Sequence, residues 1–170
     1  MLETPEELDH LQRLLDASMA GAGPHLRDII SDERRLDALQ LTERLQGLCL
    51  LVLATGTADG RPLAGPIDGY FLHGAFWFST GTQSVRLRHL ATRPAVSATY
   101  LPGEELAVTV HGRAECHPIH DAACADLRQA MLDAYLPKQG PSFEEWLENV
   151  DGIGARIEPE KIFTFQLASG

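Results

Sequence analysis

The fold is decided by the stretch LCLLVLATGTADGRPLAGPIDGYFLHGAFWFSTGTQSVRLRHLATRPAVSATYLPGEELAVTVHGRA, residues 48–114. Short apolar segments alternate in it with turn-forming residues, which is the pattern of successive β-strands. We expect strands at residues 48–55, 62–72, 75–80, 95–100 and 106–115. The dipeptide His73-Gly74 joins the second strand to the third so tightly that the two predict an antiparallel hairpin.

A short helix at residues 84–91 interrupts this series of strands. After the series we expect two helices and a closing pair of strands, at residues 121–135, 142–150, 156–158 and 161–167. Five or six short strands with one inserted helix predict a barrel, because a closed sheet leaves no exposed edge. The fold class is therefore mainly β with flanking helices, and residues 47–170 are expected to form the barrel domain with its C-terminal helices.

The N-terminal residues 1–46 carry helical signals instead. Thr4 is placed to cap a helix that begins at Pro5, and Glu7 completes a capping box. A second amphipathic helix is expected at residues 31–46. Its buried face is expected to consist of three leucines, Leu36, Leu39 and Leu45. We interpret this part as a helical N-terminal extension packed on the barrel, with no chemistry of its own.

The charge pattern narrows the class of ligand. The chain of 170 residues has a formal net charge of −10, which disfavours nucleic acid and an anionic membrane surface as partners. Residues 61–100 are the exception, because they contain four arginines and a single acid, Asp68. A locally basic segment in an acidic protein favours a small anionic ligand.

Cysteine usage and hydropathy predict a cytoplasmic location. The three cysteines are odd in number and show no CxxC spacing, so they do not form a disulfide framework. The N-terminus has no basic segment followed by an apolar one, as a signal peptide would have. The longest apolar run, residues 48–54, is too short to span a bilayer.

The strongest chemical signal lies in residues 79–90. A strand ends in Ser79 and Thr80, passes a glycine, and leads into a helix capped by Ser84. Free backbone N–H groups at a helix start favour an anion. Arg88 lies four residues after Ser84 on one helical face, and Arg86 in the first turn can swing toward the same anion. The pattern thus predicts a phosphate site, although a capped surface helix with solvated arginines would look the same.

The order and spacing of several short motifs resemble those of the pyridoxamine 5′-phosphate oxidase-like family, the FMN-binding split barrels. The resemblance covers residues 45–116 well and the C-terminal part more loosely. It rests on Ala54-Thr55, Asp59-Gly60-Arg61-Pro62, Phe76-Trp77-Phe78-Ser79-Thr80, Ser84-Val85-Arg86 and Arg93-Pro94-Ala95-Val96-Ser97. The resemblance implies a split β-barrel that binds a flavin or deazaflavin, in a homodimer with the cofactor between subunits.

Carried over by position, the resemblance places Ser84 and Arg86 at the phosphate of the cofactor, and the segment Gly65-Pro66-Ile67-Asp68 against its ring. True pyridoxamine-phosphate oxidases have an Arg and a Lys on that strand, where this chain has Gly65 and Tyr70. That departure favours the branch that uses the deazaflavin coenzyme F420. FMN remains an alternative, and haem a less favoured one. The cofactor-binding residues so predicted are Gly65, Pro66, Ile67, Asp68, Ser79, Thr80, Ser84, Arg86 and Arg88.

Several other side chains have both a chemical and a structural interpretation. Asp68 can orient substrate or cofactor, or face solvent. For Tyr70 and Trp77 packing is favoured over contact with the ring, and Trp146 is interpreted as a docking residue. His111 can be an axial haem ligand, although a hydrogen-bonded barrel histidine is favoured. A metal site is not predicted from the cluster of Cys116, His117, His120 and Cys124, because its spacing does not suit tetrahedral ligation.

The leading functional hypothesis is an oxidoreductase that moves a hydride between a bound flavin-type cofactor and a small organic substrate. The cofactor would carry the redox chemistry, so the sequence identifies no catalytic residue. The alternative is a non-catalytic cofactor carrier or a haem-binding and sequestering protein of the same fold. A third possibility is a purely structural dimer that has lost its ligand.

Overall fold

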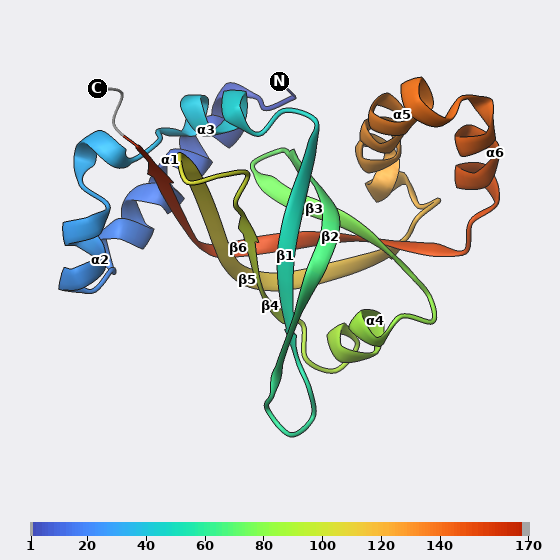
Figure 1. The fold of residues 1–170 in the computed structure, drawn as a ribbon, viewed down its shortest axis with the longest axis horizontal. Coiled ribbons are helices and arrows are strands. Elements are labelled where there is room, and N and C mark those ends of the chain that lie inside the picture. Colours follow the sequence, from blue (N-terminus) through green and yellow to red (C-terminus); the bar gives the residue numbers. More distant parts are fainter. Residues whose placement is uncertain (1, 168–170) are drawn as a thin grey trace.

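The computed structural model of the chain describes residues 2–167, and six antiparallel strands form its centre (Figure 1). They close into a barrel in the order β1-β2-β3-β6-β5-β4. The strands are β1 (Leu48–Gly56), β2 (Pro62–Leu72), β3 (Ala75–Gly81), β4 (Ala95–Tyr100), β5 (Leu106–Pro118) and β6 (Gly152–Gln166). This confirms the predicted split-barrel fold, and each of the first five strands lies where alternation and turn residues predicted it.

The last strand differs from the prediction. Instead of a pair of strands at residues 156–158 and 161–167, one continuous strand, β6, pairs with β3 and with β5. The dipeptide Pro159-Glu160 resembles a turn in the sequence but forms a β-bulge, where the register shifts between His111 and Gly112. A bulge accommodates proline, because it locally interrupts the ladder of hydrogen bonds to which the missing N–H would donate. Gly112 is required there, since a Cβ would lie 2.1 Å from the carbonyl oxygen of Glu158.

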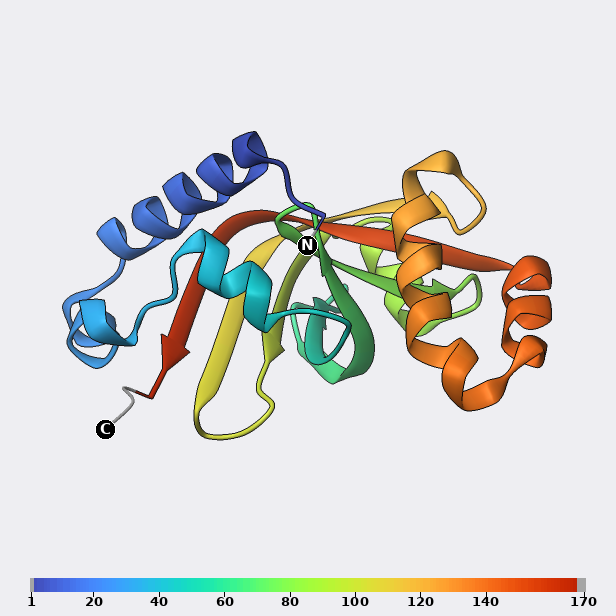
Figure 2. The ribbon, with the colours of Figure 1, turned by 90° about the horizontal axis from the view of Figure 1, so that it is seen from above.

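The N-terminal helices cover one end of the barrel (Figures 1 and 2). They are α1 (Pro5–Ala20), α2 (Pro24–Ile29), the 3-10 turn η1 (Asp32–Arg34) and α3 (Ala38–Arg44). The capping box of Thr4 and Glu7 forms as predicted. The prediction of a single helix at residues 31–46 is wrong. The Asp37 side chain accepts a hydrogen bond from the backbone N–H of Gln40, and so starts a new helix after an extended break.

This break also changes the buried face of the second segment. Leu36 and Leu45 are buried as expected, whereas Leu39 is 46% exposed and Leu41 is fully buried in its place. Leu11 and Leu41 belong to the same hydrophobic cluster as the barrel strands. The N-terminal helices are therefore part of the barrel core, and the burial of each such leucine contributes about 1.5–3 kcal/mol to stability.

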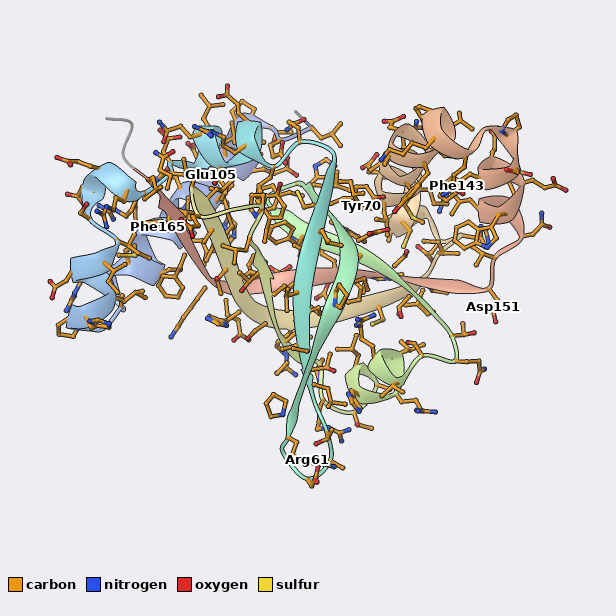
Figure 3. The ribbon with its side chains drawn as sticks, in the orientation of Figure 1. Arg61, Tyr70, Glu105, Phe143, Asp151 and Phe165 are labelled. Carbon is orange, nitrogen blue, oxygen red and sulfur yellow. The ribbon has the colours of Figure 1, made fainter. Side chains whose placement is uncertain are left out.

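The remaining helices lie on the other side of the barrel. They are α4 (Val85–Leu90), the 3-10 turn η2 (Ala122–Cys124), α5 (Ala125–Gln139) and α6 (Pro141–Asn149). The pair α5–α6 packs on the outer wall of the barrel through a second hydrophobic cluster that includes Tyr70, Trp77 and Phe143, two of which are labelled in Figure 3. Trp146 stacks on Phe143 with ring centroids 5.3 Å apart and stays 49% exposed. Within residues 2–167, no helix has the length and apolarity to cross a membrane.

Candidate functional site

A groove opens between α4 and the paired strands β1 and β2, with a volume of about 260 Å³. Its apolar walls come from Leu53, Leu63 and Val85. Its polar lining comes from Thr55, Ser84, Arg86 and His89, with Gly65 in the opposite wall. Among the described residues that line the groove, none is acidic. The groove is therefore electrostatically suited to an anion, although the chain as a whole is acidic.

Arg86 is the cation of this groove. One guanidinium nitrogen, Nη2, lies 3.5 Å from the carbonyl oxygen of Pro66, so the side chain reaches across to β2. Gly65 faces it, because a Cβ built at Gly65 would lie 3.9 Å from the same nitrogen. Partial burial lowers the pKa of Arg86, but a guanidinium remains protonated at physiological pH. Arg86 thus supplies a fixed positive charge, and its other N–H groups are available to a ligand.

Ser84 supplies a hydroxyl whose direction is set by its neighbours. Its Oγ accepts hydrogen bonds from the backbone N–H of Leu87, at 3.0 Å, and from the hydroxyl of Thr80, at 2.9 Å. With both lone pairs engaged, the Ser84 proton is left to donate. Thr80 therefore does not line the groove itself but orients the Ser84 hydroxyl that does.

Two residues of the groove were missed by the sequence reasoning. Thr55 lies at the end of β1, and its Oγ1 is 2.9 Å from Nδ1 of His89 on α4. Thr55 is buried, so this bond ties α4 to the barrel wall. No local signal could have paired residues 34 positions apart, although His89 shares a helical face with Arg86 through its spacing of three.

The structure separates the predicted cofactor residues into two groups. Gly65, Ser84 and Arg86 meet at the groove, which Pro66 borders with its carbonyl group. The other five do not line it, and Thr80 among them reaches the groove only through its hydrogen bond to Ser84. Ile67 packs against the barrel core, Asp68 and Ser79 lie elsewhere on the wall, and Arg88 is exposed.

Asp68 faces away from the groove because successive residues of a strand point to opposite faces. Its cross-strand partner is Leu50, which is 59% exposed on the outer wall. There the hydroxyl of Tyr135, on α5, donates a hydrogen bond to Asp68 Oδ2. This hydrogen bond, together with burial, raises the pKa of Tyr135 to about 12, so the phenol keeps its proton. Asp68 is thus a link between the barrel and α5.

The other candidates from the sequence lie apart from the groove. Within the described part of the chain, no three His, Cys, Asp or Glu side chains are grouped as metal ligands would be. Cys124 is buried, and burial raises the pKa of its thiol. His111 is exposed on β5, with Nδ1 2.7 Å from Oγ of Ser97.

Several hollows of the described chain are larger than the groove, and three of them lie beside α1. Two of these, of about 510 and 360 Å³, are lined by Asp16 and Asp32, and the third, of about 490 Å³, by Glu6, Glu7 and Glu158. A further hollow of about 360 Å³, at His111, contains Glu160. Arginines lie in all three hollows beside α1, but carboxylates there repel an anion and compete for the arginines. The smaller groove at Arg86 is therefore the better candidate site.

Comparison with known proteins agrees with this architecture. A family model described as Pyridoxamine 5′-phosphate oxidase matches residues 39–162. No curated protein sequence matches the chain. The fold is similar to that of the conserved hypothetical protein Rv2991 from Mycobacterium tuberculosis, with a TM-score of 0.65 and 18% identity over 80% of this chain and 88% of that one.

Two further similar structures carry a description of a ligand. The haem storage protein HutZ from Vibrio cholerae has a TM-score of 0.62 and 19% identity, over 77% of this chain and 97% of its own. A protein described as an F420 reductase has a TM-score of 0.52 and 18% identity, over 70% of this chain and 92% of its own. At these identities the likeness establishes a shared fold.

Proposed function

Because this chain belongs to the pyridoxamine 5′-phosphate oxidase family, we propose that it is an oxidoreductase that binds a flavin-type cofactor through its phosphate and transfers a hydride to or from a small organic substrate. The observation that carries the proposal is the acid-free groove in which Arg86 faces Gly65. When bound, a flavin or deazaflavin supplies the redox chemistry, while the protein binds and orients it and excludes water.

The residues present fit a phosphate group. Arg86 offers several N–H donors in a planar fork, which matches the oxygens of a phosphate, and Ser84 adds a hydroxyl donor. Gly65 leaves open the space over the Arg86 guanidinium that a side chain would fill. The cation thus comes from α4, with no basic side chain on β2 between Pro62 and Leu72. This supports the preference for F420 over FMN.

The size of the groove indicates where the rest of the cofactor lies. Sites that enclose a drug-sized ligand measure roughly 300–1,000 Å³, and the groove at about 260 Å³ holds only part of a flavin. The ring must therefore extend beyond the groove. At its mouth Leu63 and Val85 are 48% and 49% exposed, and on the opposite face of the β1–β2 pair Leu50 and Val52 are 59% and 52% exposed. Since so much exposed apolar surface favours association, we propose that a second copy of the chain covers the ring in a homodimer.

The proposal is tested by titrating the protein with F420, FMN and haem under identical conditions. Arg86→Ala should weaken binding of the preferred flavin-type cofactor at least tenfold, because a charge-assisted contact to phosphate is lost. An unchanged affinity would remove the groove as the phosphate site. Turnover with a small acceptor would then separate an enzyme from a non-catalytic carrier.

Haem binding is the second candidate function, and one observation favours it. His111 is exposed on the barrel wall, and its bond to Ser97 through Nδ1 leaves Nε2 to act as an axial ligand. A Soret band that His111→Ala abolishes, without turnover, would favour this alternative. If none of the three ligands raises the melting temperature, a structural role is favoured. For location we propose the reducing cytoplasm, which suits three free cysteines.

A further inference from the structure

His89 and Arg86 line the same groove. The two residues are three apart on α4 and therefore neighbours on one helical face. Arg88, between them in the chain, is exposed. The groove thus receives two nitrogen-bearing side chains from one helix.

The orientation of the His89 ring is fixed from the barrel side. Its Nδ1 is bonded to Oγ1 of Thr55, which is 6% exposed and leaves the ring little freedom. The two nitrogens lie at different edges of an imidazole, so Nε2 is turned away from Thr55. Within residues 2–167, no hydrogen bond is described for Nε2. A ring nitrogen of a half-buried side chain in an acid-free groove is suited to a ligand.

We propose that His89 is a second ligand-contacting residue of the groove, held by Thr55 so that its Nε2–H donates to an oxygen of a phosphate ester. In this arrangement the Thr55 hydroxyl donates to Nδ1, and the proton of the neutral ring sits on Nε2. His89 then adds a hydrogen-bond donor to the groove, while Arg86 supplies the fixed positive charge. The inference rests on the proposed phosphate site and adds the residue that completes it.

The test measures binding of inorganic phosphate, and of F420 and FMN, by calorimetry. His89→Ala should weaken binding at least tenfold, as expected for one lost hydrogen bond to a charged acceptor. His89→Gln, which retains an N–H donor, should recover part of this loss. Thr55→Val should weaken binding through the ring, and His25→Ala, at an exposed histidine on α2, serves as the matched control.

A second measurement does not depend on variants that fold. Long-range ¹⁵N NMR of the wild-type protein reports which ring nitrogen of His89 carries the proton. Protonation at Nε2, with a change in that signal on adding phosphate, is the expected result. Protonation at Nδ1, or unchanged affinity in His89→Ala while Arg86→Ala loses binding, would overturn the inference and leave the proposed function intact. If the wild-type protein binds neither phosphate nor F420 nor FMN, the proposed function fails as well.

Discussion

Nε2 of His73 lies 3.0 Å from Oδ2 of Asp126, and this contact fastens the β2–β3 turn to the first turn of α5. The other ring nitrogen, Nδ1, lies 3.0 Å from Oε1 of Glu7 on α1. A neutral imidazole can donate from only one nitrogen, so only the protonated ring satisfies both carboxylates. His73 therefore joins α1 to α5 when it is charged.

This contact predicts a pH dependence of stability. Burial alone would lower the pKa of His73, but the hydrogen bonds and charges of Asp126 and Glu7 outweigh it and raise the pKa. The stabilisation is then fully present below the unfolded-state pKa of about 6.5 and is lost as the pH rises through the higher folded-state value. The free energy of unfolding, measured by urea titration, should fall across this window in the wild type. His73→Gln should flatten that fall, and His25→Gln should not; a wild type whose stability is level above pH 6.5 would contradict the prediction.

Gly65 provides a steric test of the groove. Valine at this position would place methyl groups within reach of the Arg86 guanidinium, because a Cβ alone lies 3.9 Å from it. Gly65→Val should reduce affinity for the phosphate-bearing cofactor at least tenfold with little change in melting temperature, since β2 tolerates a β-branched residue. Gly56→Val is the control, because nothing lies within 4 Å of a Cβ there. Equal affinities of the two variants would argue against a ligand at Arg86.

The packing of α3 predicts a contrast between two leucines. Leu41 is fully buried in the barrel core and Leu39 is 46% exposed, although they are two residues apart. Leu41→Ala should lower the free energy of unfolding by about 2–5 kcal/mol through lost burial and a cavity. Leu39→Ala should change it by no more than about 0.5 kcal/mol. The reverse order in a denaturant titration would show that α3 packs through its other face.

The proposed dimer predicts that charges on the outer face of β1 lower the mass of the sedimenting particle from that of a dimer to that of a monomer. Glutamates in place of Leu50 and Val52 would put charges into the outer face of β1, where both side chains are more than half exposed. The double variant should sediment as a monomer at concentrations where the wild type is a dimer. Ile29→Glu, on the exposed surface of α2, should leave the mass unchanged. A wild type that is monomeric throughout would contradict the proposal.

What the sequence predicted depended on how local each signal was. The strands up to β5 are bounded by turns such as His73-Gly74, and such signals act over a few residues. The break before α3 depends on Asp37, which is the N-cap of that helix. It was not predicted because leucines continue at helical spacing on both sides of the break. Two strands were expected, one on either side of Pro159 and Glu160, because the bulge there depends on the distant partner strand β5.

The candidate site was predictable to the same extent. Ser84 and Arg86 lie within one short segment, so a single motif could identify both. Thr55 with His89, and Asp68 with Tyr135, are brought together across 34 and 67 residues only when the barrel closes. Strand alternation then decides which of Gly65 and Asp68 faces Arg86, and that register cannot be read without knowing which face is covered.

The position of β6 has a consequence for how the barrel is made during translation. Strands β1 to β5 emerge from the ribosome first, but β3 and β5 have no shared neighbour until residues 152–166 follow. Until then two sheet edges stay open and able to pair with other nascent chains. The helices α5 and α6 are synthesised during this interval, and by packing on Tyr70 and Trp77 they can shield the apolar outer wall while it waits for its final strand.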